Sequence, residues 1–170
     1  MLYVFVEGPD DYNYFEKIFG ESFGEYKIIK YANMPKVKLN NFIRTIPSIP
    51  DSDYLFFGDE DNKGVENKKA ELLSQYDSLS SSNLFIVQFE IESWYYAGVT
   101  QEVCKKLKLK HYQHDTNTLT KEQFYSKLSR PSERKYVMSQ ILMLYSKELA
   151  KIRNNSFNVF FSKTKEPAAV

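Results

Sequence analysis

The stretch Tyr54-Leu55-Phe56-Phe57-Gly58-Asp59-Glu60-Asp61-Asn62 is an apolar run that ends in three consecutive acids. An apolar run bounded by turn residues is typical of a buried strand. Acids at the carboxyl end of such a strand lie where open α/β sheets bind ligands. Because side chains alternate along an extended chain, Asp59 and Asp61 should point the same way. Two such oxygen ligands suit Mg²⁺ or Mn²⁺, whereas a polar loop with solvated acids is the alternative interpretation.

Three more apolar runs predict strands at residues 2–6, 26–32 and 84–89. Helical spacing of apolar residues follows them at 10–19 and 37–46, and residues 63–76 read as a polar helix on which Lys68 faces water. Strands that alternate with helices imply right-handed crossovers and a parallel sheet. We therefore expect an α/β fold with a parallel sheet of about four strands flanked by helices.

The last part of the chain has a different character. Helical patterns dominate it, at residues 103–109, 120–128, 133–153 and 156–162. There is no internal repeat and no long linker that would separate two domains. We expect a first domain at 1–98 and a helical C-terminal extension at 99–170, packed on it as a cap in one compact unit, with Trp94 in the core.

Composition limits the functional classes. The chain has 170 residues, of which 42% are hydrophobic, enough for a sizeable core. The 23 basic and 22 acidic side chains nearly cancel, so any binding of nucleic acid must be local. A single cysteine, Cys104, excludes an internal disulfide and a cysteine-based zinc site and fits a reducing compartment. Without a signal peptide or a run of transmembrane length, we expect a cytoplasmic protein with no membrane partner.

Acids follow three of the predicted strands. Glu7 comes after the first strand with Asp11 one helical turn later, Asp59 and Asp61 end the third, and Glu90 or Glu92 follows the fourth. Carboxylates crowded at one edge of a sheet repel one another unless cations lie between them. Metal binding is the interpretation that explains all these positions together.

Two motifs resemble the Toprim family, the catalytic domain of topoisomerases, bacterial primases and OLD-type nucleases. They are Val6-Glu7-Gly8 and Gly58-Asp59-Glu60-Asp61, each at the end of a hydrophobic strand and in the expected order, and the resemblance covers roughly residues 1–95. The chain looks most like OLD-type nucleases and small stand-alone Toprim proteins of bacteria and phages. Asp11 replaces the second Glu of the nuclease pattern V-E-G-x-x-E, and the segment around Trp94 resembles the stand-alone proteins and favours Glu92 over Glu90.

The resemblance implies a Rossmann-like Toprim fold and a metal-dependent nuclease, a hydrolase that cleaves DNA or RNA in phage defence or nucleic-acid processing. It implies Glu7, Asp59 and Asp61 as catalytic residues, and these three together with Asp11 and Glu92 as ligands of one or two Mg²⁺ or Mn²⁺ ions. No Walker A motif is present in the chain, so an ATPase partner would be separately encoded.

Basic residues near the end of the chain are candidates for binding the nucleic-acid backbone. They are Lys147, Lys151, Arg153 and Lys163, of which the first three recur at about one helical turn. A solvated helix face is the alternative interpretation. Two other functions stay open: a non-catalytic Toprim-like binding or regulatory module, and a primase-like nucleotidyl transferase, for which the sequence shows no nucleotide pocket. The oligomeric state is likewise open.

Overall fold

The computed structural model describes residues 1–20, 24–110 and 112–164. In chain order its elements are β1 (Leu2–Val6), α1 (Pro9–Phe19), β2 (Tyr26–Lys30), α2 (Lys36–Thr45), β3 (Asp53–Asp59), α3 (Val65–Gln75), β4 (Leu84–Val87), α4 (Ile91–Ala97), α5 (Gln101–Lys106), α6 (Lys121–Ser126), α7 (Arg134–Met143), α8 (Lys147–Arg153) and α9 (Asn155–Thr164). Two compact units divide the chain, Met1–Ile86 and Val87–Val170. This boundary precedes α4, whereas the sequence suggested one after residue 98.

The first unit is built on a four-stranded parallel sheet in the order β2-β1-β3-β4. The predicted α/β fold with helices flanking about four parallel strands is confirmed. Phe5 of β1 pairs with Ile29 of β2 on one side and with Phe56 of β3 on the other. The chain therefore reverses its direction of travel across the sheet between β1 and β3. In open α/β sheets such a switch point forms the ligand crevice at the carboxyl ends of the strands.

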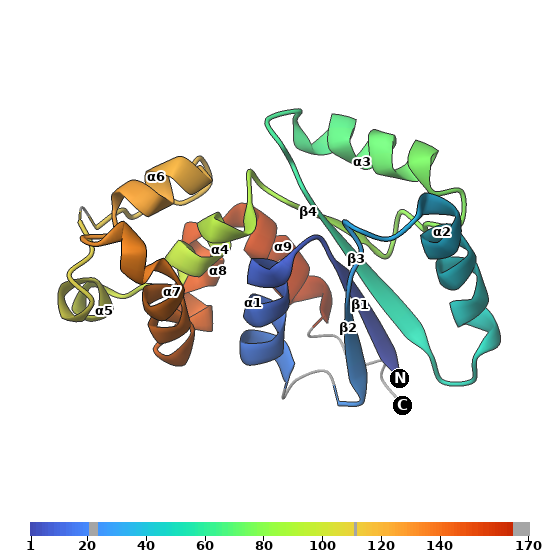
Figure 1. The fold of residues 1–170 in the computed structure, drawn as a ribbon, viewed down its shortest axis with the longest axis horizontal. Coiled ribbons are helices and arrows are strands. Elements are labelled where there is room, and N and C mark those ends of the chain that lie inside the picture. Colours follow the sequence, from blue (N-terminus) through green and yellow to red (C-terminus); the bar gives the residue numbers. More distant parts are fainter. Residues whose placement is uncertain (21–23, 111, 165–170) are drawn as a thin grey trace. The chain divides into compact units, whose positions relative to one another are not determined.

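Helices cover both faces of this sheet. In Figure 1, α1 lies on one side and α2 and α3 lie on the other. Phe56 packs on the α2 and α3 side, in a cluster with Leu39 and Leu72. The next residue, Phe57, points to the opposite face, where its ring centroid lies 4.3 Å from that of Phe15 on α1. β3 is therefore apolar on both faces. Burial of each such side chain contributes about 1.5–3 kcal/mol to the free energy of folding.

The core of the second unit forms around Trp94, which is fully buried. Its indole ring stacks on Phe160 with centroids 5.6 Å apart and meets the edge of Phe157 at 5.3 Å. The indole N–H donates to the hydroxyl of Ser156 at 2.8 Å, which satisfies the one polar atom of the side chain. The predicted core position of Trp94 is confirmed.

The helical pattern at residues 133–153 does not form one helix. It is divided into α7 and α8, and Tyr145 lies between them. The ring of Tyr145 lies directly on Gly98, where an added Cβ would come within 2.2 Å of a ring carbon. Its hydroxyl donates to the carbonyl oxygen of Trp94 at 2.8 Å, and Ser146 then caps α8 by accepting the Leu149 N–H. A tertiary contact with the end of α4 thus overrides the local helical preference.

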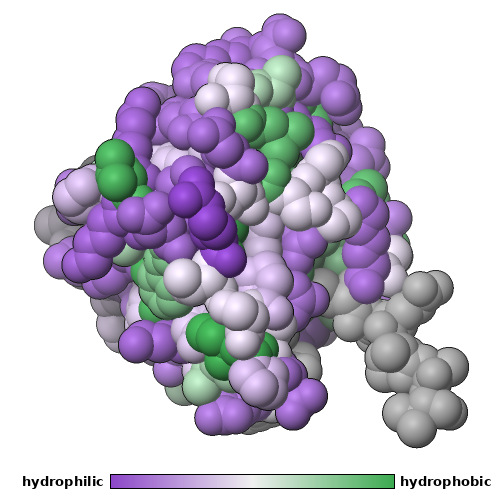
Figure 2. Space-filling view, turned by 90° about the vertical axis from the view of Figure 1, so that its right-hand side faces the viewer, coloured by the Kyte–Doolittle hydropathy of each residue, from purple (hydrophilic) through white to green (hydrophobic). Residues whose placement is uncertain are grey.

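The surface offers no broad apolar area on the face shown in Figure 2, where hydrophobic residues form small separate groups among hydrophilic ones. In residues 1–20, 24–110 and 112–164, no helix combines the length and apolar character that crossing a bilayer requires.

Candidate functional site

Glu7 and Asp59 lie at the switch point of the sheet. Glu7 directly follows β1, Asp59 is the last residue of the neighbouring β3, and both lie beyond the paired residues Phe5 and Phe56. The Oε2 atom of Glu7 is buried and accepts no hydrogen bond from any described residue. Burying an oxygen of a carboxylate without a partner is costly, so this atom is suited to a cation that enters the site.

Tyr31, just beyond β2, lies within the electrostatic reach of several of the predicted acids. Its side chain is buried, and its hydroxyl donates to the carbonyl oxygen of Phe57 at 2.9 Å. Burial raises the pKa of Tyr31 well above its ordinary value, and the negative charges of Glu7, Asp59 and Asp11 raise it further. The charges of all three predicted acids therefore act on this one hydroxyl. Tyr31 falls in the strand expected at residues 26–32, where no pattern marked it as part of a site.

Asp11 has a clear structural role at the start of α1. Its carboxylate accepts the N–H of Gly8, the residue that caps the helix, at 3.0 Å, and its side chain is only 6% exposed. Pro9 occupies the first helical turn, where its missing N–H costs nothing. An acid that satisfies the N-terminal amide of a helix stabilises the turn that follows Glu7.

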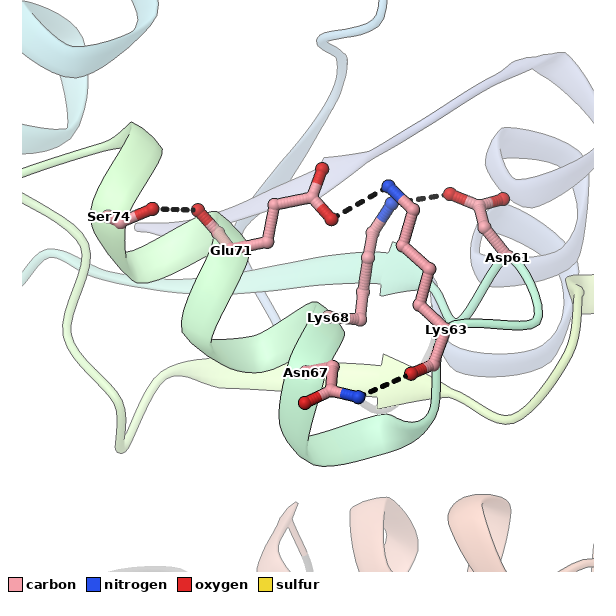
Figure 3. Close-up of polar contacts among 6 residues, drawn as sticks. All are labelled: Asp61, Lys63, Asn67, Lys68, Glu71 and Ser74. Atoms are coloured by element: carbon pink, nitrogen blue, oxygen red, sulfur yellow. Dashed lines mark hydrogen bonds and ion pairs between the residues drawn. The ribbon is translucent and has the colours of Figure 1, made fainter.

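Asp61 departs from the expected geometry. The strand ends at Asp59, and Asp61 and Asn62 have left-handed backbone angles, with φ of 54° and 58°. The alternation of side chains along an extended chain therefore does not reach Asp61. Its carboxylate turns to the ammonium group of Lys68 on α3, and the two atoms Oδ2 and Nζ lie 2.5 Å apart (Figure 3).

Lys68 is 7% exposed, so the prediction that it faces water is wrong. The reason lies in Gly58, the residue before Asp59. A Cβ at Gly58 would come within 2.6 Å of Leu72 Cδ1 and 3.8 Å of Lys68 Cε, so only glycine lets α3 approach this closely. Burial alone would lower the pKa of Lys68, but the hydrogen bond to Asp61 and the charges of Asp61, Glu7 and Glu71 raise it overall. Lys68 is therefore a charged cation inside the acidic site.

Glu90 and Glu92 belong to the second unit, where both contact the start of α6. Glu92 is 1% exposed, and its Oε1 accepts the hydroxyl of Tyr125 at 2.7 Å and lies 3.6 Å from Lys121 Nζ. Glu90 accepts the N–H of Lys121 at 3.0 Å. Burial raises the pKa of Glu90, although the Lys121 N–H opposes this shift. These contacts tie α4 to α6.

Arg153 is 3% exposed, so the prediction that it belongs to a basic surface is wrong. Its Nε donates to the carbonyl of His114 at 3.1 Å. One terminal nitrogen donates to the carbonyls of Tyr96, Ala97 and Val99, at 3.1, 3.1 and 2.6 Å. The guanidinium group thus supplies donors to carbonyls at and just beyond the end of α4, where an α-helix leaves carbonyl groups without internal partners.

The three candidate lysines differ in exposure. Lys163 on α9 is exposed, whereas Lys147 and Lys151 on α8 are half-buried. Lys151 pairs with Glu148 and its ammonium lies 4.9 Å from the ring centroid of Phe161. The predicted row of cations at one helical turn is therefore interrupted by the burial of Arg153 and partly neutralised at Lys151.

The donor set fits a hard divalent ion. Carboxylate oxygens at the ends of adjacent strands are the ligands that Mg²⁺ and Mn²⁺ prefer, and Glu7 presents a buried oxygen without a partner among the described residues. In the part of the chain that the structure describes, no three His, Cys, Asp or Glu side chains are grouped so that they could hold a metal ion as they stand. Asp61 instead pairs with Lys68.

Comparison of the chain with protein-family models, curated proteins and solved structures finds no match. The resemblance to the Toprim family consequently rests on the motif residues themselves.

We expect Asp59→Asn and Asp61→Asn to have opposite effects on metal-free stability. Asp59→Asn removes a negative charge that Glu7 and Asp11 repel, and should raise the melting temperature by about a degree or more. Asp61→Asn leaves the buried ammonium of Lys68 without the Asp61 carboxylate and should lower the free energy of unfolding by roughly 1–2 kcal/mol. The cost is not larger because the Asp61 side chain is 43% exposed and water screens the pair. Thermal unfolding in EDTA measures both, and a loss of several degrees in Asp59→Asn would make Asp59 a structural residue.

Proposed function

We propose that this protein is a divalent-metal-dependent nuclease whose Mg²⁺ or Mn²⁺ ions are held by Glu7, Asp59 and Asp61. The observation that carries the proposal is the buried Oε2 of Glu7, which has no hydrogen-bond partner among the described residues. Glu7 directly follows β1, which pairs with β3, the strand that ends at Asp59. This position is the switch point of a parallel sheet, where such folds bind ligands. The resemblance of both motifs to Toprim nucleases supports the same chemistry.

Each residue has a distinct part in the proposed reaction. Divalent ions, when bound, activate water and stabilise the leaving oxygen of a phosphodiester. Glu7 and Asp59 are fixed by adjacent strands, so their carboxylates have little freedom to lose when they bind a cation. Tyr31 stays a neutral hydroxyl because its pKa is high, and it orients the backbone of β3 through the Phe57 carbonyl. Asp11 and Glu92 have structural contacts that account for them without metal.

The partners follow from this chemistry. The substrate is DNA or RNA, and Lys163, with Lys147 and Lys151, supplies candidate contacts to phosphates. A separately encoded ATPase is the partner that the resemblance to OLD-type nucleases suggests. The single cysteine fits action in the cytoplasm.

A non-catalytic binding module is the second candidate, and the Lys68–Asp61 ion pair favours it. A cation built into the protein can neutralise the acids permanently, and the site would then need no metal. Under this hypothesis the acidic edge of the sheet serves only as a structural or recognition element.

Cleavage of nucleic acid tests the proposal. Purified protein is incubated with single- and double-stranded DNA and RNA in Mg²⁺, in Mn²⁺ and in EDTA. We expect cleavage of at least one substrate with either metal and none in EDTA. Absence of cleavage of every substrate in both metals would favour the non-catalytic module.

A further inference from the structure

The Lys68–Asp61 pair has features that set it apart from an ordinary surface ion pair. The side chain of Lys68 is 9% exposed, whereas the nearby pair of Lys63 and Glu71 is 47% and 41% exposed (Figure 3). Lys68 feels the negative charge of Glu7 as well as that of Asp61. Its ammonium therefore offsets the charge of two of the acids, Asp61 and Glu7, that the proposed function assigns to metal binding.

We propose that Lys68 is the resident counter-ion of this site in the metal-free protein, and that a divalent ion loads only by displacing the Lys68 ammonium from Asp61. The inference rests on the proposed metal site and adds a regulatory step to it. The Lys68–Asp61 pair then sets the ion concentration at which the nuclease becomes active.

Distance makes the two cations competitors. Lys68 Nζ lies 2.5 Å from Asp61 Oδ2, while Mg²⁺ binds carboxylate oxygens at about 2.0–2.1 Å. A metal ion and an ammonium group cannot occupy the same side of one oxygen, and their like charges repel. Each cation must therefore weaken the binding of the other.

The local backbone allows this exchange without unfolding of the sheet. Asp61 is 43% exposed and lies in a turn outside β3, with Asn62 and Gly64 also at positive φ. Lys68 lies on α3, which packs on Gly58. When Asp61 turns to a metal ion, the negative charge of Glu71 still acts on the Lys68 ammonium.

Lys68→Met tests the exchange, since it removes the ammonium and keeps an apolar stem of similar length. Lys63→Met is the matched control, with the same change of charge in an exposed pair on the same segment. Binding of Mn²⁺ is measured by electron paramagnetic resonance, and thermal unfolding is followed in EDTA and in Mn²⁺. We expect Lys68→Met to bind Mn²⁺ about fivefold more tightly or better, and Lys63→Met to stay within about twofold of wild type.

The metal-free Lys68→Met protein should also melt at a lower temperature than wild type and gain more from added Mn²⁺, because its acids lack a counter-ion. Mn²⁺ affinity of Lys68→Met equal to or weaker than that of wild type would overturn the exchange. Should this variant not fold, Lys68→Gln serves the same comparison.

The readouts separate this inference from the proposed nuclease. Tighter Mn²⁺ binding by Lys68→Met with no cleavage by wild type would refute only the nuclease. Metal-dependent cleavage by wild type with unchanged Mn²⁺ affinity in Lys68→Met would refute only the exchange. Absence of Mn²⁺ binding in both proteins would refute both.

Discussion

Glu7→Gln is expected to abolish metal-dependent cleavage, with a loss of well over a hundredfold. Partners that merely orient a metal ligand already contribute about 10–100-fold to affinity or activity, so a ligand itself should contribute more. Glutamine preserves the size of the side chain and removes the charge. The buried Oε2 position of Glu7 would then hold a neutral amide that attracts a divalent ion only weakly. Rates of cleavage by Glu7→Gln and wild type, at matched concentration in Mn²⁺, measure the loss.

Asp59→Asn and Asp61→Asn should each lose activity to a similar degree, and a double variant should be little worse than either single one. Residues that act as one unit in catalysis give losses that do not add. Asp53→Asn is a suitable control, because this acid lies at the opposite end of β3. Equal cleavage by wild type and Glu7→Gln would place the activity at another site or in a contaminant.

Arg153→Ala is expected to cause the largest loss of stability of any substitution considered. The guanidinium group donates to four carbonyl oxygens of buried or partly buried backbone, three of them where α4 ends. Its removal takes a donor from all four acceptors, of which the Tyr96 carbonyl still accepts the N–H groups of Gly98 and Val99. It also opens a cavity beside Tyr96, over whose ring the guanidinium lies at 5.5 Å. We expect a cost of roughly 3–5 kcal/mol, on the order of ten degrees in melting temperature.

Lys163→Ala is the control for Arg153→Ala, because Lys163 is exposed and its loss should change stability by less than about 0.5 kcal/mol. Thermal unfolding followed by circular dichroism measures both variants. Should Arg153→Ala melt like wild type and instead lose affinity for nucleic acid, the role of Arg153 would lie in binding after all.

The parallel sheet of the first unit could be predicted from the local pattern of apolar residues. Both the strand at Leu2–Val6 and the apolar run that ends at Asp59 are apolar on both faces, and only a central strand of a parallel sheet buries both faces. Acids at the ends of these strands likewise indicated the edge at which a site would lie. Both features are local in the sequence, so they can be predicted without information on contacts between distant residues.

The roles of the charged residues depend on tertiary contacts. Lysine and arginine are usually surface residues, and the helical spacing of the sequence predicted exposed positions for both Lys68 and Arg153. Lys68 is buried because Gly58, ten residues earlier in the chain, lets α3 approach the strand and Asp61 turns back toward it. Arg153 is buried because the carbonyls at the end of α4, far away in sequence, need donors. A charge is buried where distant groups compensate its lost hydration, and such partners become visible only when the chain has folded.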